Sequence, residues 1–116
     1  MSFVTTTEGP VILIGYPWRL QIAAEAPVFA QEARYLGQVR AKISAPEVLA
    51  TLLSETGGVI WISEQMLELA LTGAETAAMA PGRVVLDLVR TDLAAHLHLG
   101  FSLEIPVQQA VTRGGP

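Results

Sequence analysis

The sequence predicts an all-β protein, an antiparallel β-sandwich of about seven short strands with one short helical turn. The first observation is strict alternation of apolar and polar residues, clearest over Arg83–Arg90 and Ala95–Val107. Successive side chains of a strand point to opposite faces, so alternation gives a strand one buried and one solvated face. Second, glycine, proline, serine and threonine interrupt the apolar stretches at regular intervals, as in a sandwich. Third, 116 residues without a cysteine are enough for one domain with its own core and exclude a disulfide framework.

Two strands are expected near the start of the chain. Val11–Ile14 is a short apolar run flanked by prolines at positions 10 and 17. Proline cannot donate to a strand ladder, so this run is expected at the edge of a sheet. Trp18–Ala23 alternates, with Leu20 and Ile22 on one side and arginine and glutamine on the other.

The stretch from Val28 to Ile43 can be interpreted as a helix or a strand. Its apolar residues fit either period, but Gly37 weakens a helix by about 1 kcal/mol relative to alanine. We therefore expect a loop or short helical turn up to about Ala33 and a strand after it.

The next stretch is also open to two interpretations. Ser44–Glu47 resembles a capping box with proline in the first turn, and it could start a helix through Leu53. The alternative is a strand that pairs with Val59–Ser63 across the Gly57-Gly58 turn, since Gly-Gly between apolar runs is a hairpin signal. We favour the strand.

A strand and a helical turn are expected in the middle of the chain. Leu67–Leu71 alternates leucine with glutamate and alanine. Thr72–Ala80 is predicted to be a short helical turn, because Thr72 can cap it and Glu75 lies three residues further on. Pro81-Gly82 ends the turn.

The two long alternating stretches are predicted to form a hairpin. A four-residue loop, Thr91–Ala94, sets Arg90 opposite Ala95 and Asp87 opposite His98. A shift by one residue would turn the apolar side chains of one strand to the wrong face, so this register is favoured.

The composition limits the partners of the chain. Charged residues make up 16%, against roughly 25% in typical domains, so we expect other subunits to cover part of the apolar surface. The net charge is −4 and the densest basic segment is Arg40–Lys42, which argues against binding nucleic acid through phosphates. The first ten residues lack the basic and apolar regions of a signal peptide, and no apolar run is long enough for a transmembrane helix. We expect no membrane partner.

Few residues are candidates for chemistry. His96, His98 and Asp87 form a weak metal candidate, because a His-x-His pair with a carboxylate can bind zinc or iron. No further ligand is evident, so a solvent-facing pair is the favoured interpretation and no metal or cofactor is expected. Arg83 and Asp87 share a strand face and are interpreted as a surface pair. No serine lies in a nucleophile elbow and no phosphate-binding loop is present, so the chain is not expected to be an enzyme.

The aromatic residues suggest a contact surface. Ile60 and Ile62 are expected to face the core, which leaves Trp61 pointing outward. An outward tryptophan with few charges nearby is typical of a protein–protein interface. The alternatives are a core position after a β-bulge, or a stacking platform for sugar or single-stranded nucleic acid formed with Trp18 and Tyr35.

The order of motifs resembles the small Ig-like β-sandwich proteins of tailed bacteriophages, such as the N-terminal domain of baseplate upper proteins of lactococcal phages. The resemblance covers Trp18 to Arg113, and its most specific part combines Thr76, Pro81-Gly82 and Asp87. The sequence departs from the family pattern between Val28 and Leu36 and before Trp18. The motifs that carry the resemblance are Gln38-Val39-Arg40, Leu69–Arg90, Ile105-Pro106-Val107 and Val111-Thr112-Arg113.

The resemblance implies an Ig-like sandwich and a non-catalytic structural protein of the virion, assembled in the bacterial cytoplasm. The expected position is the tail, the baseplate or the fibre-attachment region. The alternatives are a capsid decoration protein of the phage head or a carbohydrate-binding adhesion module. The expected partners are other virion proteins and further copies of the chain. We divide the chain into an N-terminal arm (1–10), one sandwich domain (11–113) and a C-terminal tail (114–116). The residues predicted to contact neighbours are Phe3, Val4, Trp61, Val111 and Arg113.

Overall fold

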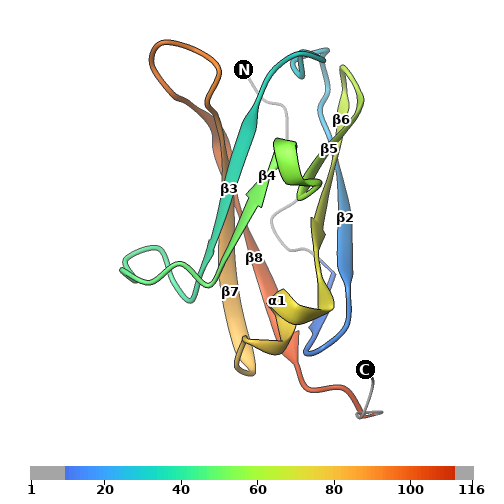
Figure 1. Ribbon diagram of the computed structural model, residues 1–116, viewed down its shortest axis with the longest axis vertical. Helices are drawn as coiled ribbons and strands as arrows, with labels where there is room; N and C mark the ends of the chain where they lie inside the picture. Colours follow the sequence, from blue (N-terminus) through green and yellow to red (C-terminus); the bar gives the residue numbers. More distant parts are fainter. Residues whose placement is uncertain (1–9, 112–116) are drawn as a thin grey trace.

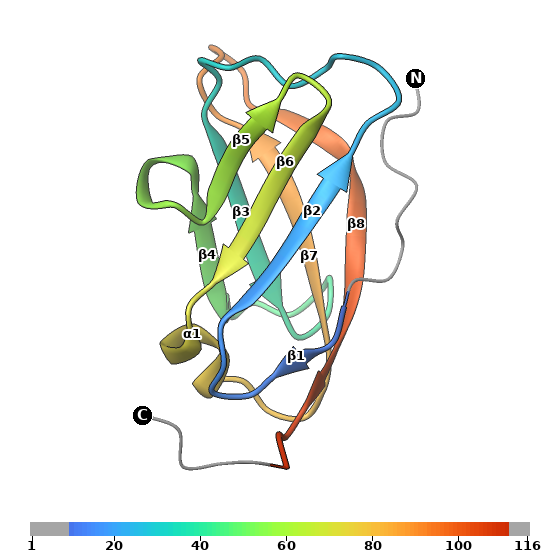
Figure 2. The ribbon, with the colours of Figure 1, turned by 90° about the vertical axis from the view of Figure 1, so that its right-hand side faces the viewer.

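The computed structural model describes residues 10–111, which form a sandwich of two β-sheets (Figure 1). The larger sheet has the strand order β1-β8-β7-β3-β4, and the smaller sheet, seen in front in Figure 2, has the order β2-β6-β5. The predicted Ig-like, all-β fold class is confirmed, with one parallel pair, β1 with β8, among otherwise antiparallel pairs. The strands are β1 (Ile12–Leu13), β2 (Trp18–Ala23), β3 (Tyr35–Arg40), β4 (Ala50–Leu53), β5 (Val59–Ser63), β6 (Met66–Leu71), β7 (Gly82–Arg90) and β8 (Leu97–Gln108).

The core lies between the two sheets and consists of the inward residues of the alternating strands. In β6, Leu67, Leu69 and Leu71 are buried, whereas the residues between them are only partly buried. Burying a leucine or isoleucine side chain is worth about 1.5–3 kcal/mol, so these alternating strands supply most of the driving force for folding. The largest fully buried side chains are Phe29, Ile12, Ile22, Leu52, Leu67, Leu69, Leu86, Leu88, Leu103, Ile105, Val39 and Val107.

The first two strands lie where the sequence predicts them. β1 is the edge strand of the larger sheet, with Ile12 beside Val107 of β8. β2 has the predicted bounds and pairs with β6, with Trp18 opposite Leu71. A loop then leads to β3, as expected for the stretch after Val28.

The strand interpretation of Ala50–Leu53 is confirmed, but the hairpin predicted with Val59–Ser63 is wrong. β4 pairs with β3 in the larger sheet, and β5 pairs with β6 in the smaller one. A 3₁₀ turn, Ser54–Thr56, followed by two glycines carries the chain from one sheet to the other. A Cβ at Gly58 would lie 2.8 Å from the Cα of Leu52, so glycine is needed where the two strands come close.

The predicted helical turn is α1 (Gly73–Ala77), which joins β6 to β7. Both halves of the predicted capping box are present. The Thr72 hydroxyl accepts the Glu75 N–H at 3.1 Å, and the Glu75 carboxylate accepts the Thr72 N–H at 2.8 Å. In the part of the chain that the structure describes, no helix has the length and hydropathy to cross a membrane.

The hairpin of β7 and β8 forms, but the predicted register is wrong. Arg90 pairs with Leu97 rather than Ala95, and Asp87 pairs with Ser102 rather than His98. The loop is longer than expected, and an irregularity that includes Gly100, at φ 83°, adds further residues to β8. Both displacements are even numbers of residues, so each side chain keeps its predicted face although its partner changes.

Candidate functional site

The outer face of the larger sheet brings together polar residues from three strands. Gln38 of β3 pairs with Asp87 of β7, and Asp87 pairs with Ser102 of β8. Paired residues in neighbouring strands point to the same face, so the three form one polar row across the sheet. The next row, from the same strands, consists of Arg40, Val85 and Glu104.

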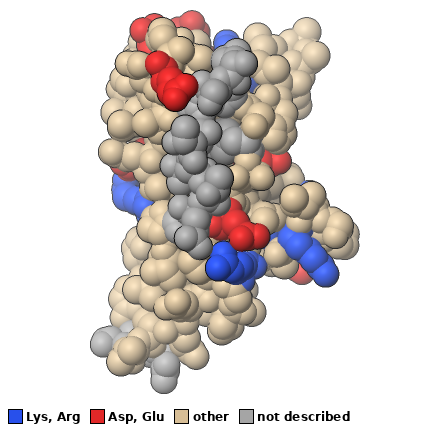
Figure 3. All heavy atoms as spheres, turned by 180° about the vertical axis from the view of Figure 1, so that it is seen from behind, with Lys and Arg blue, Asp and Glu red and all other residues tan. Residues whose placement is uncertain are grey.

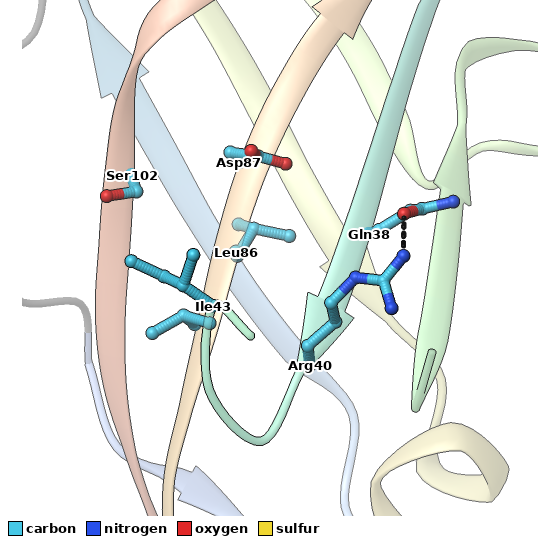
Figure 4. A pocket seen from close by; sticks show the side chains of 7 residues that line it. Gln38, Arg40, Ile43, Leu86, Asp87 and Ser102 are labelled. Carbon is cyan, nitrogen blue, oxygen red and sulfur yellow. Dashed lines mark hydrogen bonds between the residues drawn. The ribbon is translucent and has the colours of Figure 1, made fainter. Parts of the chain in front are cut away.

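A hollow of about 110 Å³ lies between these two rows (Figure 4). Ile43, on the loop between β3 and β4, borders the hollow and is 79% exposed. Pockets for drug-sized ligands usually measure about 300–1,000 Å³, so the hollow is too small for such a ligand. Single exposed apolar residues are common on protein surfaces, so Ile43 marks this face for a protein contact only together with the hollow beside it. The lining residues are Gln38, Arg40, Ile43, Val85, Leu86, Asp87 and Ser102.

Arg40 holds the loop that carries Ile43. Its guanidinium donates to the carbonyl oxygens of Ala45 and Pro46 at 2.8 and 2.9 Å. It also donates to the side-chain oxygen of Gln38 at 2.9 Å, a bond drawn in Figure 4. With these bonds made, Arg40 positions the loop rather than offering a free cation to a ligand.

His98 and Asp87 are in contact, as the sequence predicts, although they are not directly paired in the ladder. The Nε2 atom of His98 lies 2.8 Å from Oδ2 of Asp87, and the N–H of Gly100 donates to Nδ1 at 2.9 Å. Because Nδ1 accepts a hydrogen bond, the proton of a neutral ring lies on Nε2 and is donated to Asp87. Both ring nitrogens are therefore engaged within the protein.

This geometry does not form the metal site that the sequence suggests for His96, His98 and Asp87. A metal ion binds a lone pair of imidazole, and each nitrogen of His98 already has a partner. His96 precedes β8, so the strand alternation expected to place both histidines on one face does not reach it. Residues 10–111 contain no group of three or more histidine, cysteine, aspartate or glutamate side chains that could hold a metal ion.

The expected outward direction of Trp61 is wrong. Trp61 packs against the core and donates its indole N–H to the carbonyl oxygen of Phe29 at 3.0 Å, whereas Ile62 is exposed. The strand turns Val59, which is buried, and Trp61, which is partly buried, toward the core. Its pairing with β6 becomes irregular between Trp61 and Ser63. The alternative of a core position therefore describes this residue better, although the bulge follows Trp61 rather than precedes it.

The stacking platform is also wrong. Trp18 is 4% exposed and Tyr35 is 2% exposed, so neither ring can lie against a sugar or a base. The Trp18 indole donates to the carbonyl oxygen of Pro10 at 2.9 Å, and the Tyr35 ring meets Phe29 edge-on.

The other residues predicted to contact neighbours lie near the chain ends. Val111 is 97% exposed, which is consistent with a contact role. Phe3, Val4 and Arg113 lie outside the described residues, and their predicted role stays a prediction.

A charged cluster closes the end of the larger sheet at the loop between β7 and β8. Arg90 donates to both carboxylate oxygens of Asp92, at 2.8 and 3.1 Å, and the Arg34 N–H donates to the same carboxylate. These bonds, that of Arg90 foremost, lower the pKa of Asp92 to about 2. The cluster joins the loop to the start of β3.

The sequence did not single out Ile43 or Arg40 as site residues. The sequence predicts a strand after about Ala33 that includes Ile43, but β3 ends at Arg40 and Ile43 lies in the following loop. Ser44-Ala45-Pro46 directly after Ile43 was the one available signal, because such residues favour turns.

Comparisons with known proteins give a likeness of fold. No family model and no curated protein matches the chain. The endo-β-1,4-mannanase from Thermotoga petrophila matches over 94% of this chain and 19% of that chain, with a TM-score of 0.52 and 11% identity. The fibronectin(III)-like modules of Clostridium thermocellum CbhA match over 95% of this chain and 99% of that chain, with a TM-score of 0.40 and 18% identity. The chain thus spans about a fifth of the mannanase chain, and the likeness extends to the fold alone.

Proposed function

We propose that the chain is a non-catalytic β-sandwich module that binds other proteins within a symmetric assembly. The observation that carries this proposal is the outer face of the larger sheet, where Ile43 stands exposed beside a small polar hollow. The ionisable groups beside it are already bonded within the protein, Arg40 to the loop and Asp87 to His98. A general base or nucleophile needs a free reactive atom, whereas a contact surface needs shape and an apolar anchor. In Figure 3, which shows the molecule from behind, most of the described surface belongs to residues other than Lys, Arg, Asp and Glu.

We further propose that the assembly is a bacteriophage virion, with the chain in the tail, the baseplate or the fibre-attachment region. The support is the motif resemblance that includes Thr76, Pro81-Gly82 and Asp87. Thr76 is fully buried and bonds the turn between β1 and β2, so the motif has a role in shaping the sandwich. Decoration of the capsid is the alternative position in the particle.

The test is the protein content of purified phage particles released from the strain that encodes the chain. Mass spectrometry should find the chain in a fixed ratio to the tail proteins, and gold-labelled antibody should mark one position on the particle. Label on the head would instead assign the chain to the capsid. Absence of the chain from intact particles, while it is abundant in the lysate, would refute the virion proposal.

A further inference from the structure

One side of β8 is largely unpaired within the described residues, 10–111. β7 pairs along one side of this strand, and on the other side β1 reaches only Val107 and Gln108. Within residues 10–111, β1 is the only neighbour of β8 on that side, so the segment from Leu97 to Pro106 forms an open edge. Figure 2 shows β8 at the rim of the sandwich, with β1 near its C-terminal end.

The backbone groups that face this edge follow from one hydrogen bond. The N–H of Ile14 donates to the carbonyl oxygen of Gln108 at 3.0 Å, so the backbone of Gln108 faces the β1 side. Alternate residues of a strand direct their backbone groups the same way, which places those of Pro106, Glu104 and Ser102 on the open edge. Proline fits position 106, because an N–H that is missing on this side removes no hydrogen bond from the ladder with β7.

An open edge of this length is a template for another strand. Natural sheets protect such edges with charged residues, prolines or a covering segment. β8 carries a single acidic or basic residue other than histidine, Glu104, and Leu97 at its start is 51% exposed. The edge thus carries one charge, one proline and the irregularity at Gly100, and its exposed end at Leu97 is apolar.

The register of β1 is poorly suited to continue along this edge. In the observed register Val11 would lie beside Pro106 and Pro10 beside Ile105, where neither proline can donate a hydrogen bond. The carbonyl oxygen of Pro10 is instead bonded to the Trp18 indole. The same register would also place Glu8 on the buried face that Ile12 occupies, because the two positions differ by an even number of residues.

We propose that residues Phe3–Glu8 of a second copy add as a strand to the open edge of β8. The segment Phe-Val-Thr-Thr-Thr-Glu is rich in the aromatic and β-branched residues that favour strands, and it contains no glycine or proline. Six residues extend about 20 Å, which matches most of the edge from Leu97 to Glu104. A segment from another copy is free to choose the register that turns Phe3 inward and Glu8 outward. This inference rests on the proposed role in an assembly and names the contact between copies.

Head-to-tail addition of this kind links each copy to the next. Such a contact closes into a ring or continues as a helical array, both of which suit a particle with rotational symmetry.

The first experiment measures mass by light scattering over a range of concentrations. The full chain should associate, and a variant lacking Ser2–Glu8 should be a monomer with an unchanged circular dichroism spectrum. Association that survives the deletion would overturn the inference and leave the proposed assembly function standing.

The second experiment tests the receiving edge with a matched pair of variants. Glu104→Pro removes an N–H that faces the open edge and none that faces β7, and Glu104→Ala keeps this N–H. Both lose the ion pair with Arg83, so they differ in the N–H at the edge and in the backbone restriction that proline imposes. The effect of this restriction on the fold is measured by comparing the unfolding of the two variants in urea. Glu104→Pro should weaken association roughly fivefold to tenfold relative to Glu104→Ala, as expected for lost hydrogen bonds. Equal association of two folded variants would overturn the inference.

Hydrogen exchange separates a second copy from the chain's own arm. The amides of Ser102 and Glu104 should exchange slowly in the associated full chain and quickly in the deletion variant. Slow exchange in a monomeric full chain would mean that the arm binds its own β8, and the inference between copies would be wrong. Detection of the chain in phage particles is independent of all these measurements.

Discussion

The hydroxyl of Thr76 accepts the backbone N–H of Gly15 at 3.0 Å, across 61 residues of sequence. The same hydroxyl lies 2.8 Å from the carbonyl oxygen of Tyr16, to which it donates. Thr76 lies on α1 and is 0% exposed, so this buried polar side chain is satisfied by the turn between β1 and β2. Because β1 belongs to the larger sheet and β2 to the smaller, one side chain fixes the turn that joins them.

Thr76→Val should destabilise the fold by about 1–3 kcal/mol, because it keeps the shape of the side chain and removes the hydrogen bonds of the buried hydroxyl to the Gly15 N–H and the Tyr16 carbonyl oxygen. Urea unfolding followed by circular dichroism measures the change. Thr76→Ser keeps the hydroxyl and is the control, with a smaller loss from the missing methyl group. If the valine variant were as stable as the wild type, the two hydrogen bonds would contribute nothing to stability.

Tyr35→Phe should leave the stability unchanged or raise it by up to about 1 kcal/mol. The Tyr35 hydroxyl is buried and has no hydrogen-bond partner among the described residues, so its removal ends an uncompensated desolvation cost. Phenylalanine keeps the edge-on contact with Phe29. Thermal unfolding of both proteins tests this, and a loss above about 1 kcal/mol would mean that the hydroxyl has a partner such as a buried water.

Stability should fall at high pH because of the same tyrosine. Burial raises the pKa of Tyr35 above its ordinary value of 10.0, so the folded protein holds this proton more tightly than the unfolded chain. The contribution of the protonated Tyr35 to the free energy of unfolding is fully present below pH 10 and is lost as the pH rises through the raised pKa. The melting temperature of the wild type should therefore drop more steeply above pH 10 than that of Tyr35→Phe. Parallel curves would contradict the raised pKa.

Ile43→Asp should reduce incorporation of the chain into particles at least about tenfold, because it places a charge at the apolar centre of the proposed contact. The free energy of unfolding of the Ile43→Asp variant should change by less than about 0.5 kcal/mol, since the Ile43 side chain is 79% exposed. Leu93→Asp, on the loop between β7 and β8, is the matched control, because Leu93 is exposed away from the hollow. Particle-bound protein is counted by quantitative mass spectrometry. Equal loss in both variants would show that the outer face of the larger sheet is not the contact.

Most of the strands and their buried faces could be predicted from the sequence, because burial acts on every second residue. The partners in the hairpin could not, because a longer loop and an irregularity at Gly100 add residues in pairs and leave the alternation intact. Gly57-Gly58 likewise indicates a turn. The dipeptide does not distinguish a hairpin within one sheet from a connection between the two sheets, which is what the structure has. That choice depends on the close approach of Gly58 to Leu52, a contact between separate strands.

The candidate site was the least predictable part. The contact of Asp87 with His98 followed from their positions on facing strands and survives the change of register. The sequence could not predict which face of Val59–Ser63 is buried, since four of its five residues are apolar and either face could be buried. The hollow depends on the loop after Arg40, whose shape is set by bonds to two carbonyl oxygens that no sequence pattern marks.

The three hydrogen bonds of Arg40 also affect how tightly the surface can bind a partner. Ordering a free loop on association costs conformational entropy, about 1–2 kcal/mol for each backbone residue that becomes fixed. The loop that carries Ile43 is held by Arg40 before any partner arrives. A partner that contacts Ile43 thus meets a preorganised surface, and its binding energy is not spent on arranging the loop.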